Sequence, residues 1–278
     1  MSKIDHKLWR NPFTGQGLRL PAGSGSGGFR MHELGAIEVD HRWQHSDVSS
    51  PFWRLFYDLS PGVWVRSGGR QYQLDEDHAI ILPEGVSFDC GASAELSHFW
   101  IHFSLPLNVH AAVTKPMEIE VGKEFQAVAK KLRSVTLEER VAQARGLGQA
   151  LLHLAFVEID TQSWEVLDPR MRRILAWLDI RLGVPITNEQ MARIAGLGIE
   201  PFIRWFKKTT GQTPAVYVTA RRMREASRRL AYEDETIDDV AEAVGYRNRH
   251  HFSRVFKRFA GVGPAGCQVK CNAGWVMD

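Results

Sequence analysis

The chain has 278 residues, of which 44% are hydrophobic and 24% are charged, and its net charge is +3. That length favours two domains, and no apolar run reaches the roughly 18 residues that a membrane-spanning helix needs. The N-terminus has no apolar core of the secretory-signal kind, and three cysteines are too few for a disulfide framework. We therefore expect a cytoplasmic protein with no membrane partner.

Charge is unevenly distributed along the chain. Residues 1–169 contain 16 Lys and Arg against 21 Asp and Glu, whereas residues 170–278 contain 19 against 11. A basic C-terminal third favours a polyanionic partner for that part alone. The alternative is a helical domain that is simply rich in arginine.

The first 28 residues are predicted to form an N-terminal arm that ends in a linker, because PAGSGSGG at 21–28 has the composition of a flexible segment. Residues 29–105 then have the pattern of many short strands separated by turn residues. Strands at this spacing indicate a barrel or a sandwich. The clearest stretches are 53–59, 63–67, 70–74, 79–83 and 98–105.

Helical periodicity begins near residue 123 and continues to about 160. Apolar residues recur there at i, i+3, i+4 and i+7, first from Phe125 and again from Ala144. One face of the second stretch is either a dimer seam or a surface buried within the monomer. Its residues are Leu147, Leu151, Leu154 and Ala155.

Beyond a boundary at 166–169, the C-terminal region contains an internal repeat. Residues 191–214 form the first copy and residues 240–264 the second. The first matches are 49 positions apart and the later ones 50, so the second turn is one residue longer. The matched pairs are Ala192/Ala241, Gly196/Gly245, Phe202/Phe252, Arg204/Arg254, Phe206/Phe256, Gly211/Gly261 and Pro214/Pro264.

Each copy has the parts of a helix-turn-helix. A small residue lies where two helices cross, and a glycine four residues later lets the chain leave the first helix with positive φ. The second helix packs through phenylalanines at i and i+4. Arg204 and Arg254, two residues after the first phenylalanine, are expected on the outer face, which enters the major groove in such motifs.

A long helix is predicted to connect the two copies. Gln212, Thr213 and Pro214 supply an N-cap and a proline at the first helical position, and we expect the helix to end near Tyr232. Its roughly 19 residues would span about 28 Å, close to the ~34 Å of one DNA turn. Thr236, which is followed by acidic residues, is predicted to cap the next helix.

Residues 170–266 resemble the AraC/XylS family of bacterial transcription regulators. The resemblance lies in the segment from Ile237 to Pro264, with its alanine, glycine-aromatic, Phe-x-Arg-x-Phe-Lys and Gly-x-x-Pro pattern. Gly263 and Gly198 replace serines that are usual in the family, and Pro201 removes a backbone donor from the first recognition helix. We therefore expect the first unit to bind DNA more weakly than the second.

Matching positions in that family's motif imply two sets of DNA contacts. Arg204, Arg249 and Arg254 are the candidates for reading bases, because a guanidinium can bond bidentately to guanine; the lysines and the helix N-terminus near Thr236 are candidates for phosphates. The alternative is that Arg204 and Arg254 form salt bridges within the domain. The full set is Glu200, Ile203, Arg204 and Lys207, then Thr236, Arg247, Asn248, Arg249, His250, Ser253, Arg254 and Lys257.

Residues 29–110 resemble, more loosely, the cupin-like barrel in which such regulators bind an effector. His98, Trp100 and His102 alternate along one strand face and are candidates for lining a cavity for a sugar or an aromatic ligand. The alternative is an ordinary strand with solvated histidines. The sequence lacks the His-x-His pair and the well-placed acid of metal-dependent cupins, and Cys267 and Cys271 lack a second cysteine pair, so we expect no metal and no cofactor.

These patterns predict an α+β protein with two domains, a cupin-like β-barrel with following helices and an all-α double helix-turn-helix domain. The predicted segments are an arm and linker at 1–28, an effector-binding and helical dimerisation domain at 29–168, the DNA-binding domain at 169–268, and a tail at 269–278.

The resemblance implies a transcription regulator, an activator rather than an enzyme, that responds to a small molecule such as a sugar. Its expected partners are double-stranded DNA at the nucleoid, the effector, a second copy of the chain and RNA polymerase. Two alternatives stay open: a cupin-type metal-dependent enzyme with an appended nucleic-acid-binding module, and a helical domain that binds proteins instead of DNA.

Overall fold

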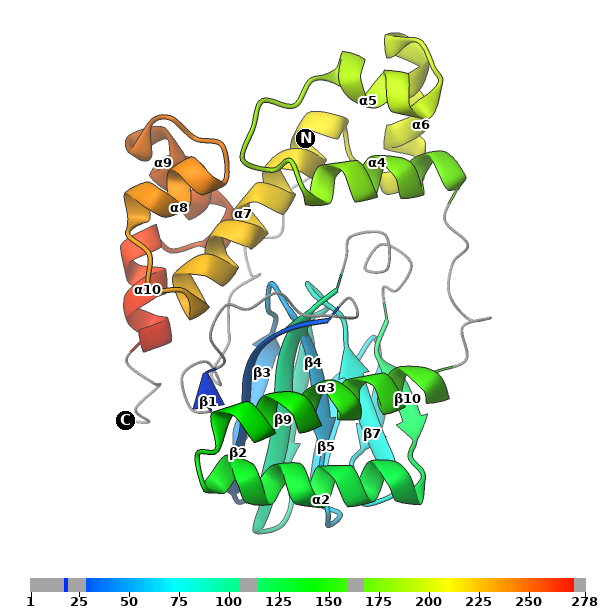
Figure 1. Ribbon diagram of the computed structural model, residues 1–278, viewed down its shortest axis with the longest axis vertical. Coiled ribbons are helices and arrows are strands. Elements are labelled where there is room, and N and C mark those ends of the chain that lie inside the picture. The colour runs from blue at the N-terminus through cyan, green and yellow to red at the C-terminus, as the bar shows by residue number, and fades with distance from the viewer. Residues whose placement is uncertain (1–17, 20–28, 106–114, 160–167, 273–278) are drawn as a thin grey trace. The chain divides into compact units, whose positions relative to one another are not determined.

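A computed structural model describes residues 18–19, 29–105, 115–159 and 168–272 (Figure 1). The described chain divides into two compact units, a β-rich unit that ends at residue 159 and a helical unit over 168–268. Of the predicted arm and linker, only Leu18–Arg19 belongs to the described residues, where it forms strand β1.

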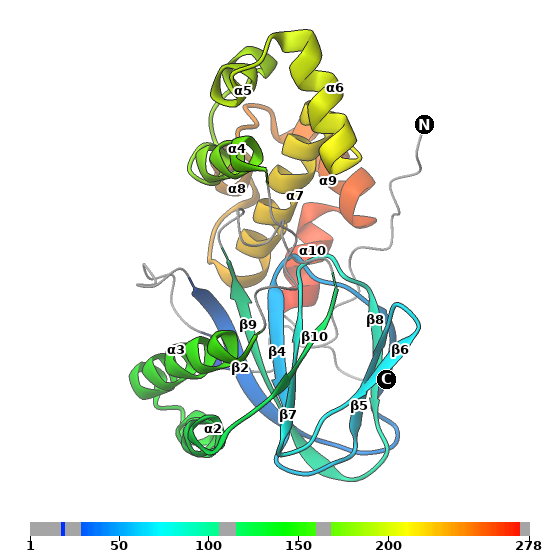
Figure 2. The same ribbon diagram turned by 90° about the vertical axis from the view of Figure 1, so that its right-hand side faces the viewer.

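Two antiparallel sheets form the β-rich unit and face one another (Figure 2). The larger sheet has the order β1-β2-β9-β4-β7-β10 and the smaller the order β3-β8-β5-β6. Their strands are β2 (Arg30–Val39), β3 (Gln44–Val48), β4 (Trp53–Tyr57), β5 (Val63–Ser67), β6 (Arg70–Gln73), β7 (His78–Leu82), β8 (Phe88–Ala92), β9 (Leu96–Ser104) and β10 (Met117–Glu120).

Apolar side chains from both sheets form one core between them. Phe56 and Trp100 from the larger sheet join Val65 and Phe88 from the smaller sheet in this cluster. The alternation of strand side chains explains the arrangement, since every second residue of β9 faces the other sheet and the rest face outward. The predicted barrel or sandwich is therefore confirmed.

Two helices cover the outer face of the larger sheet (Figure 1), α2 (Lys123–Leu137) and α3 (Val141–Glu158). Gly148 lets α3 lie close to β2, because a Cβ there would be 3.0 Å from the sulfur of Met31. Leu151 and Ala155 are fully buried in this packing. The dimer-seam interpretation is therefore wrong for these two residues, which stabilise the monomer.

The helical unit consists of seven helices within the described range. They are α4 (Pro169–Asp179), α5 (Asn188–Ala195), α6 (Ile199–Thr210), α7 (Pro214–Tyr232), α8 (Ile237–Ala243), α9 (Arg249–Ala260) and α10 (Pro264–Asn272). α10 continues past the predicted domain end at residue 268, because no glycine or proline follows before residue 272.

Capping residues explain where several of these helices begin. Thr187 and Thr236, 49 positions apart, each form a capping box with the residue three positions later, Gln190 or Asp239. The connecting helix α7 has the predicted bounds and Pro214 at its first position. Its expected side-chain cap is wrong, since Thr213 occupies the N-cap position but makes no capping hydrogen bond.

Aromatic packing fixes the second helix of each repeat. The rings of Phe202 and Phe206 have centroids 5.5 Å apart, and so do those of Phe252 and Phe256. All four are fully buried, and in the first copy the pair belongs to a core that includes α4 and α5. None of the helices in the described part of the chain is long and apolar enough to cross a membrane.

Candidate nucleic-acid interface

The two repeats fold into two helix-turn-helix units, α5–α6 and α8–α9, joined by the rod-like α7 (Figure 1). Gly196 and Gly245 take φ of 67° and 82° in the turns, a region that favours glycine because it has no Cβ. The sequence predicted both positions. Since α7 has 19 residues, it spans about 28 Å at 1.5 Å per residue.

On α6 the buried phenylalanines leave the opposite face to solvent. Glu200, Arg204 and Lys207 are exposed there, whereas Ile203 is half-buried and packs against the core of the first unit. Within residues 168–268, no ion pair involves Arg204. The guanidinium is thus available to a ligand outside the unit.

On α9 the corresponding face is more basic. Arg254 and Lys257 are exposed, Ser253 is half-buried, and Arg247 and His250 are exposed at the start of the helix. Arg254, like Arg204, belongs to no ion pair among the described residues. The salt-bridge alternative is therefore wrong for both arginines in this structure.

Three predicted contact residues already have partners within the unit. Arg249 forms an exposed ion pair with Asp238 at 2.7 Å, and the Asn248 side chain caps α9 by accepting from the backbone N–H of His251 at 2.9 Å. The Thr236 hydroxyl accepts from the Asp239 N–H and donates to its carboxylate. Contact with DNA through these side chains would compete with those bonds.

The candidate effector residues lie inside the β-rich unit. His98 and His102 are fully buried on the inner face of β9, and Trp100 between them belongs to the core that both sheets share. The expectation of solvated histidines is therefore wrong. The cause is the second sheet, which covers this face of β9 (Figure 2).

Each buried histidine lies beside a buried carboxylate. His98 Nδ1 is 3.1 Å from both carboxylate oxygens of Asp58, and His102 Nδ1 is 3.5 Å from Glu33. Burial lowers the pKa of His102 to about 4, more than its carboxylate neighbour raises it. Because a carboxylate only accepts, Nδ1 of His98 carries the hydrogen of this contact.

The buried polar atoms of this inner face that have no hydrogen-bond partner in the described structure include His98 Nε2 and Trp100 Nε1. The indole N–H of Trp100 is a donor. The fully buried Arg54 lies opposite His102 in the sheet, with its guanidinium 5.3 Å from the rings of Phe52 and Phe88. No group of three or more His, Cys, Asp or Glu in the described ranges is arranged to hold a metal.

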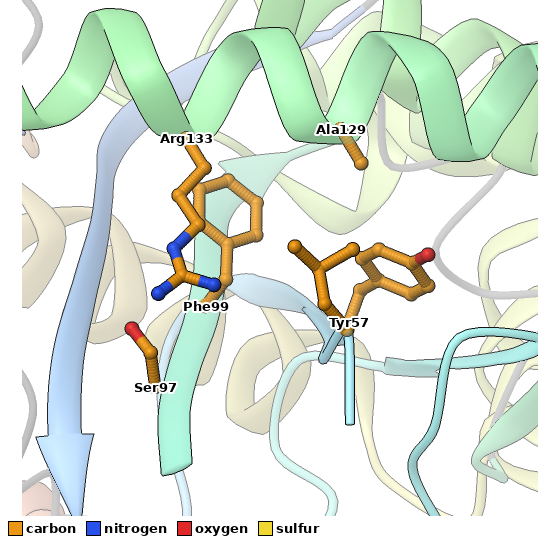
Figure 3. Close-up of a pocket in the computed structure, with 6 residues that line it drawn as sticks. Tyr57, Ser97, Phe99, Ala129 and Arg133 are labelled. Atoms are coloured by element: carbon orange, nitrogen blue, oxygen red, sulfur yellow. The ribbon is translucent and has the colours of Figure 1, made fainter. Parts of the chain in front are cut away.

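A shallow crevice lies on the other side of the larger sheet, under α2 (Figure 3). Tyr57, Phe99 and Arg133 line it together with three smaller side chains. Phe99 belongs to the outer face of β9, so this crevice is separate from the face that holds His98 and Trp100. None of the predicted effector residues lines it.

The helical unit is similar in sequence to known helix-turn-helix proteins. The model of the helix-turn-helix domain family matches residues 191–268. RhaS of Klebsiella pneumoniae, an HTH-type transcriptional activator, is 33% identical over 91 residues, a third of either chain. Residues 191–268 therefore form a helix-turn-helix domain of the AraC type.

Other HTH-type regulators are similar over more of the chain. The HTH-type regulator YobQ of Bacillus subtilis is 25% identical over 211 residues, 76% of this chain and 83% of YobQ. RhaS of Enterobacter is 26% identical over 166 residues, and the chain spans about half (54%) of its length. ToxT of Vibrio cholerae has the same two-part fold, with a TM-score of 0.53 over 86% of this chain and 97% of ToxT at 10% identity.

This AraC-type domain departs from the family pattern at its first recognition helix. Gly198 occupies the N-cap position of α6 and provides no side-chain hydrogen bond, whereas Asn248 caps α9. The expected weakness of the first unit stays a prediction. Its physical basis is the missing cap, which is worth a few tenths of a kcal/mol for glycine relative to a polar cap.

Sequence reasoning missed the carboxylates of the barrel. Asp58 and Glu33 lie 40 and 69 positions from the histidines that they contact, so no local motif connects them. A weak signal existed, because Arg54 interrupts the apolar strand Trp53–Tyr57 with a charge. A charge within a strand that is otherwise apolar indicates a polar group buried in the core.

Proposed function

We propose that this protein activates transcription by binding one bipartite DNA site with both recognition helices. The observation that carries the proposal is the pair Arg204 and Arg254, exposed at matching positions of α6 and α9 and held apart by α7. A spacing of about 28 Å between the ends of α7 is close to the ~34 Å of one helical turn of DNA. Two helices so joined can enter successive major grooves on one side of a duplex.

Within this proposal, exposed arginines read bases and lysines position the protein. Arg204 and Arg254 would each bond bidentately to the O6 and N7 of a guanine, and Lys207 and Lys257 would contact phosphates. Arg249 would reach a base only by leaving Asp238, so its contribution is smaller. Glu200, Arg247 and His250, also exposed, would contact the groove walls.

The inner face of β9 is the proposed effector site. The buried ring nitrogens His98 Nε2 and Trp100 Nε1 favour a ligand with hydroxyl groups, since a hydroxyl both donates and accepts. Aromatic faces beside them suit the apolar faces of a sugar ring. The effector regulates only if it binds one arrangement of the protein more tightly than another.

We propose a second copy of the chain and RNA polymerase as further partners. The protein would act on DNA in the nucleoid. Because Leu151 and Ala155 are buried in the monomer, we propose that dimerisation uses the exposed side of α3, where Val157 is 76% exposed. Val157→Glu is expected to convert the dimer to a monomer in light scattering. An unchanged mass would remove α3 from the interface.

Selection of duplexes from a random pool tests the DNA proposal. We expect a recovered site with two conserved segments, and binding that weakens steeply as salt rises, because phosphate contacts release counterions. Failure to enrich any sequence, together with salt-independent capture of a protein partner, would instead support the protein-interaction alternative.

Thermal shift measurements test the effector proposal. Sugars and polyols are expected to raise the melting temperature, and His98→Ala is expected to abolish that rise. Aromatic acids and long-chain fatty acids serve as comparison ligands, since the same fold in ToxT is known with an unsaturated fatty acid bound. Stabilisation by an acid and not by any polyol would contradict a hydroxylated effector.

A further inference from the structure

The two helix-turn-helix units meet at a junction beside α7. We propose that this junction, made by Arg222 of α7, the Leu182–Val184 segment and the turn at Ala243–Tyr246, fixes the angle between the recognition helices. It would thereby set the half-site spacing that the protein accepts. The inference depends on the proposed binding of DNA through both units, and it assigns positioning residues that contact no DNA.

Arg222 links the connecting helix to both units. Its Nη2 donates to the carbonyl oxygen of Val184, in the α4–α5 connection, at 2.7 Å. Its guanidinium carbon lies 5.9 Å from the ring centroid of Tyr246, which follows the turn of the second unit. One side chain from α7 therefore restrains an element of each unit.

Two glycines allow the backbones of the units to touch at the same place. A Cβ on Gly183 would lie 2.6 Å from the carbonyl oxygen of Ala243, and one on Gly245 would lie 2.8 Å from Arg222 Nη2 and 3.0 Å from the carbonyl oxygen of Leu182. Gly245 also has a φ of 82°, which independently favours glycine. Gly183 has no such second reason, so its small size is explained by the contact alone.

The connecting helix α7 and the junction restrain different motions of the two units. α7 fixes how far apart the units are, but by itself it leaves rotation of one unit about the rod axis to the flexibility of the short turns. A second contact beside the rod opposes that rotation. Because neighbouring base pairs differ by about 34° around the DNA axis, a rotation of this size is equivalent to one base pair of spacing.

Gly183→Ala is the direct test, because it inserts one methyl group into the junction and changes no charge. Gly266→Ala is the matched control, since Gly266 is in the same unit with no atom within 4 Å of its Cβ position. The full-length variants would be titrated with the selected site, with each half-site alone, and with sites lengthened or shortened by one base pair between the halves.

We expect Gly183→Ala to bind the selected site about tenfold more weakly, because the angle is no longer set in advance, and to bind each half-site within about twofold of the original protein. Its preference for the original spacing should become smaller or move by one base pair. Gly266→Ala should match the unsubstituted protein on every duplex. Loss of stability alone would weaken half-sites and full sites together and would leave the spacing preference unchanged.

Arg222→Lys is a second, independent variant. It keeps the positive charge but loses the planar guanidinium that faces Tyr246, so binding to random DNA should persist while the spacing preference weakens. If Gly183→Ala fails to bind half-sites, the spacing preference of Arg222→Lys, measured in the same assay, tests the inference instead.

The outcomes separate the two proposals. If the unsubstituted protein selects no duplex, the proposed function fails. If it selects a bipartite site but tolerates every spacing, or if both variants keep its spacing preference, the junction has no positioning role and the inference is overturned.

Discussion

Arg204 and Arg254 occupy the same place in their helices, two residues after the first buried phenylalanine. Helical geometry sends that residue to the side opposite the phenylalanine, and in both copies the arginine is exposed and outside every ion pair of the described residues. Arg249, five residues earlier on α9, differs because it forms an ion pair with Asp238 at 2.7 Å. Of the three arginines predicted to read bases, Arg249 alone would have to break an ion pair within the unit before it could bind DNA.

Replacing Arg254 with alanine is expected to weaken the selected site by roughly 5- to 150-fold, the effect of losing one bidentate base contact, with little change on random DNA. Lys257→Ala should weaken all sequences alike and lower the salt slope by about 1. Fluorescence anisotropy on specific and random duplexes at several salt concentrations measures both. Equal losses on the two duplexes for Arg254→Ala would refute this division of roles.

Buried histidine makes stability depend on pH. Burial lowers the pKa of His102 to about 4, whereas the unfolded chain has a histidine pKa of about 6.5. Between these values the unfolded chain binds a proton that the folded chain excludes, so the free energy of unfolding falls as pH falls. Urea unfolding at pH 7, 6 and 5 should show this decline, and His102→Gln should reduce its slope. Parallel pH profiles for the two proteins would contradict the assignment.

At the scale of elements, the two repeats begin in the same way. Thr187 and Thr236 each close a capping box at the start of the first helix of a unit. The second helices differ, because Asn248 caps α9 and Gly198 leaves α6 without a side-chain cap. The duplication is therefore conserved in the scaffold helices and has diverged at the entry to the recognition helices.

Thr187→Ala is expected to lower the stability of the helical unit by about 1 kcal/mol through loss of the cap. Thr187→Ser keeps the hydroxyl and should be nearly neutral. Chemical unfolding followed by circular dichroism at 222 nm compares the two, and equal stability of the alanine and serine variants would show that the capping box contributes nothing.

Local sequence patterns predicted the helices and strands well, but they predicted contacts between residues far apart in the chain poorly. The α7 helix has its predicted bounds because a proline opens it and no glycine or further proline interrupts it before Tyr232, and the strand at 63–67 agrees as well. The partner of His102 lies in β2 and that of His98 directly follows β4, and no spacing in the sequence connects them to β9. Gly183 looks like any turn glycine, and only the folded chain brings Ala243 against it.

At the scale of the whole molecule, the net charge of the chain changes sign near the boundary between the two units. The acidic first part of the chain forms the two facing sheets and their helices, and the basic last third forms the helix-turn-helix pair. A polyanion such as DNA is therefore attracted to the helical unit alone. The proposed effector site, the buried polar face of β9, belongs to the β-rich unit.

Hydroxyl-radical footprinting of the full chain on its selected duplex tests the central claim most directly, that both recognition helices engage one DNA molecule. We predict two protected segments on the same side of the duplex, about one turn or 10 base pairs apart. Arg204→Ala should remove one segment and Arg254→Ala the other. A single protected segment, or loss of both segments on either substitution, would contradict the account.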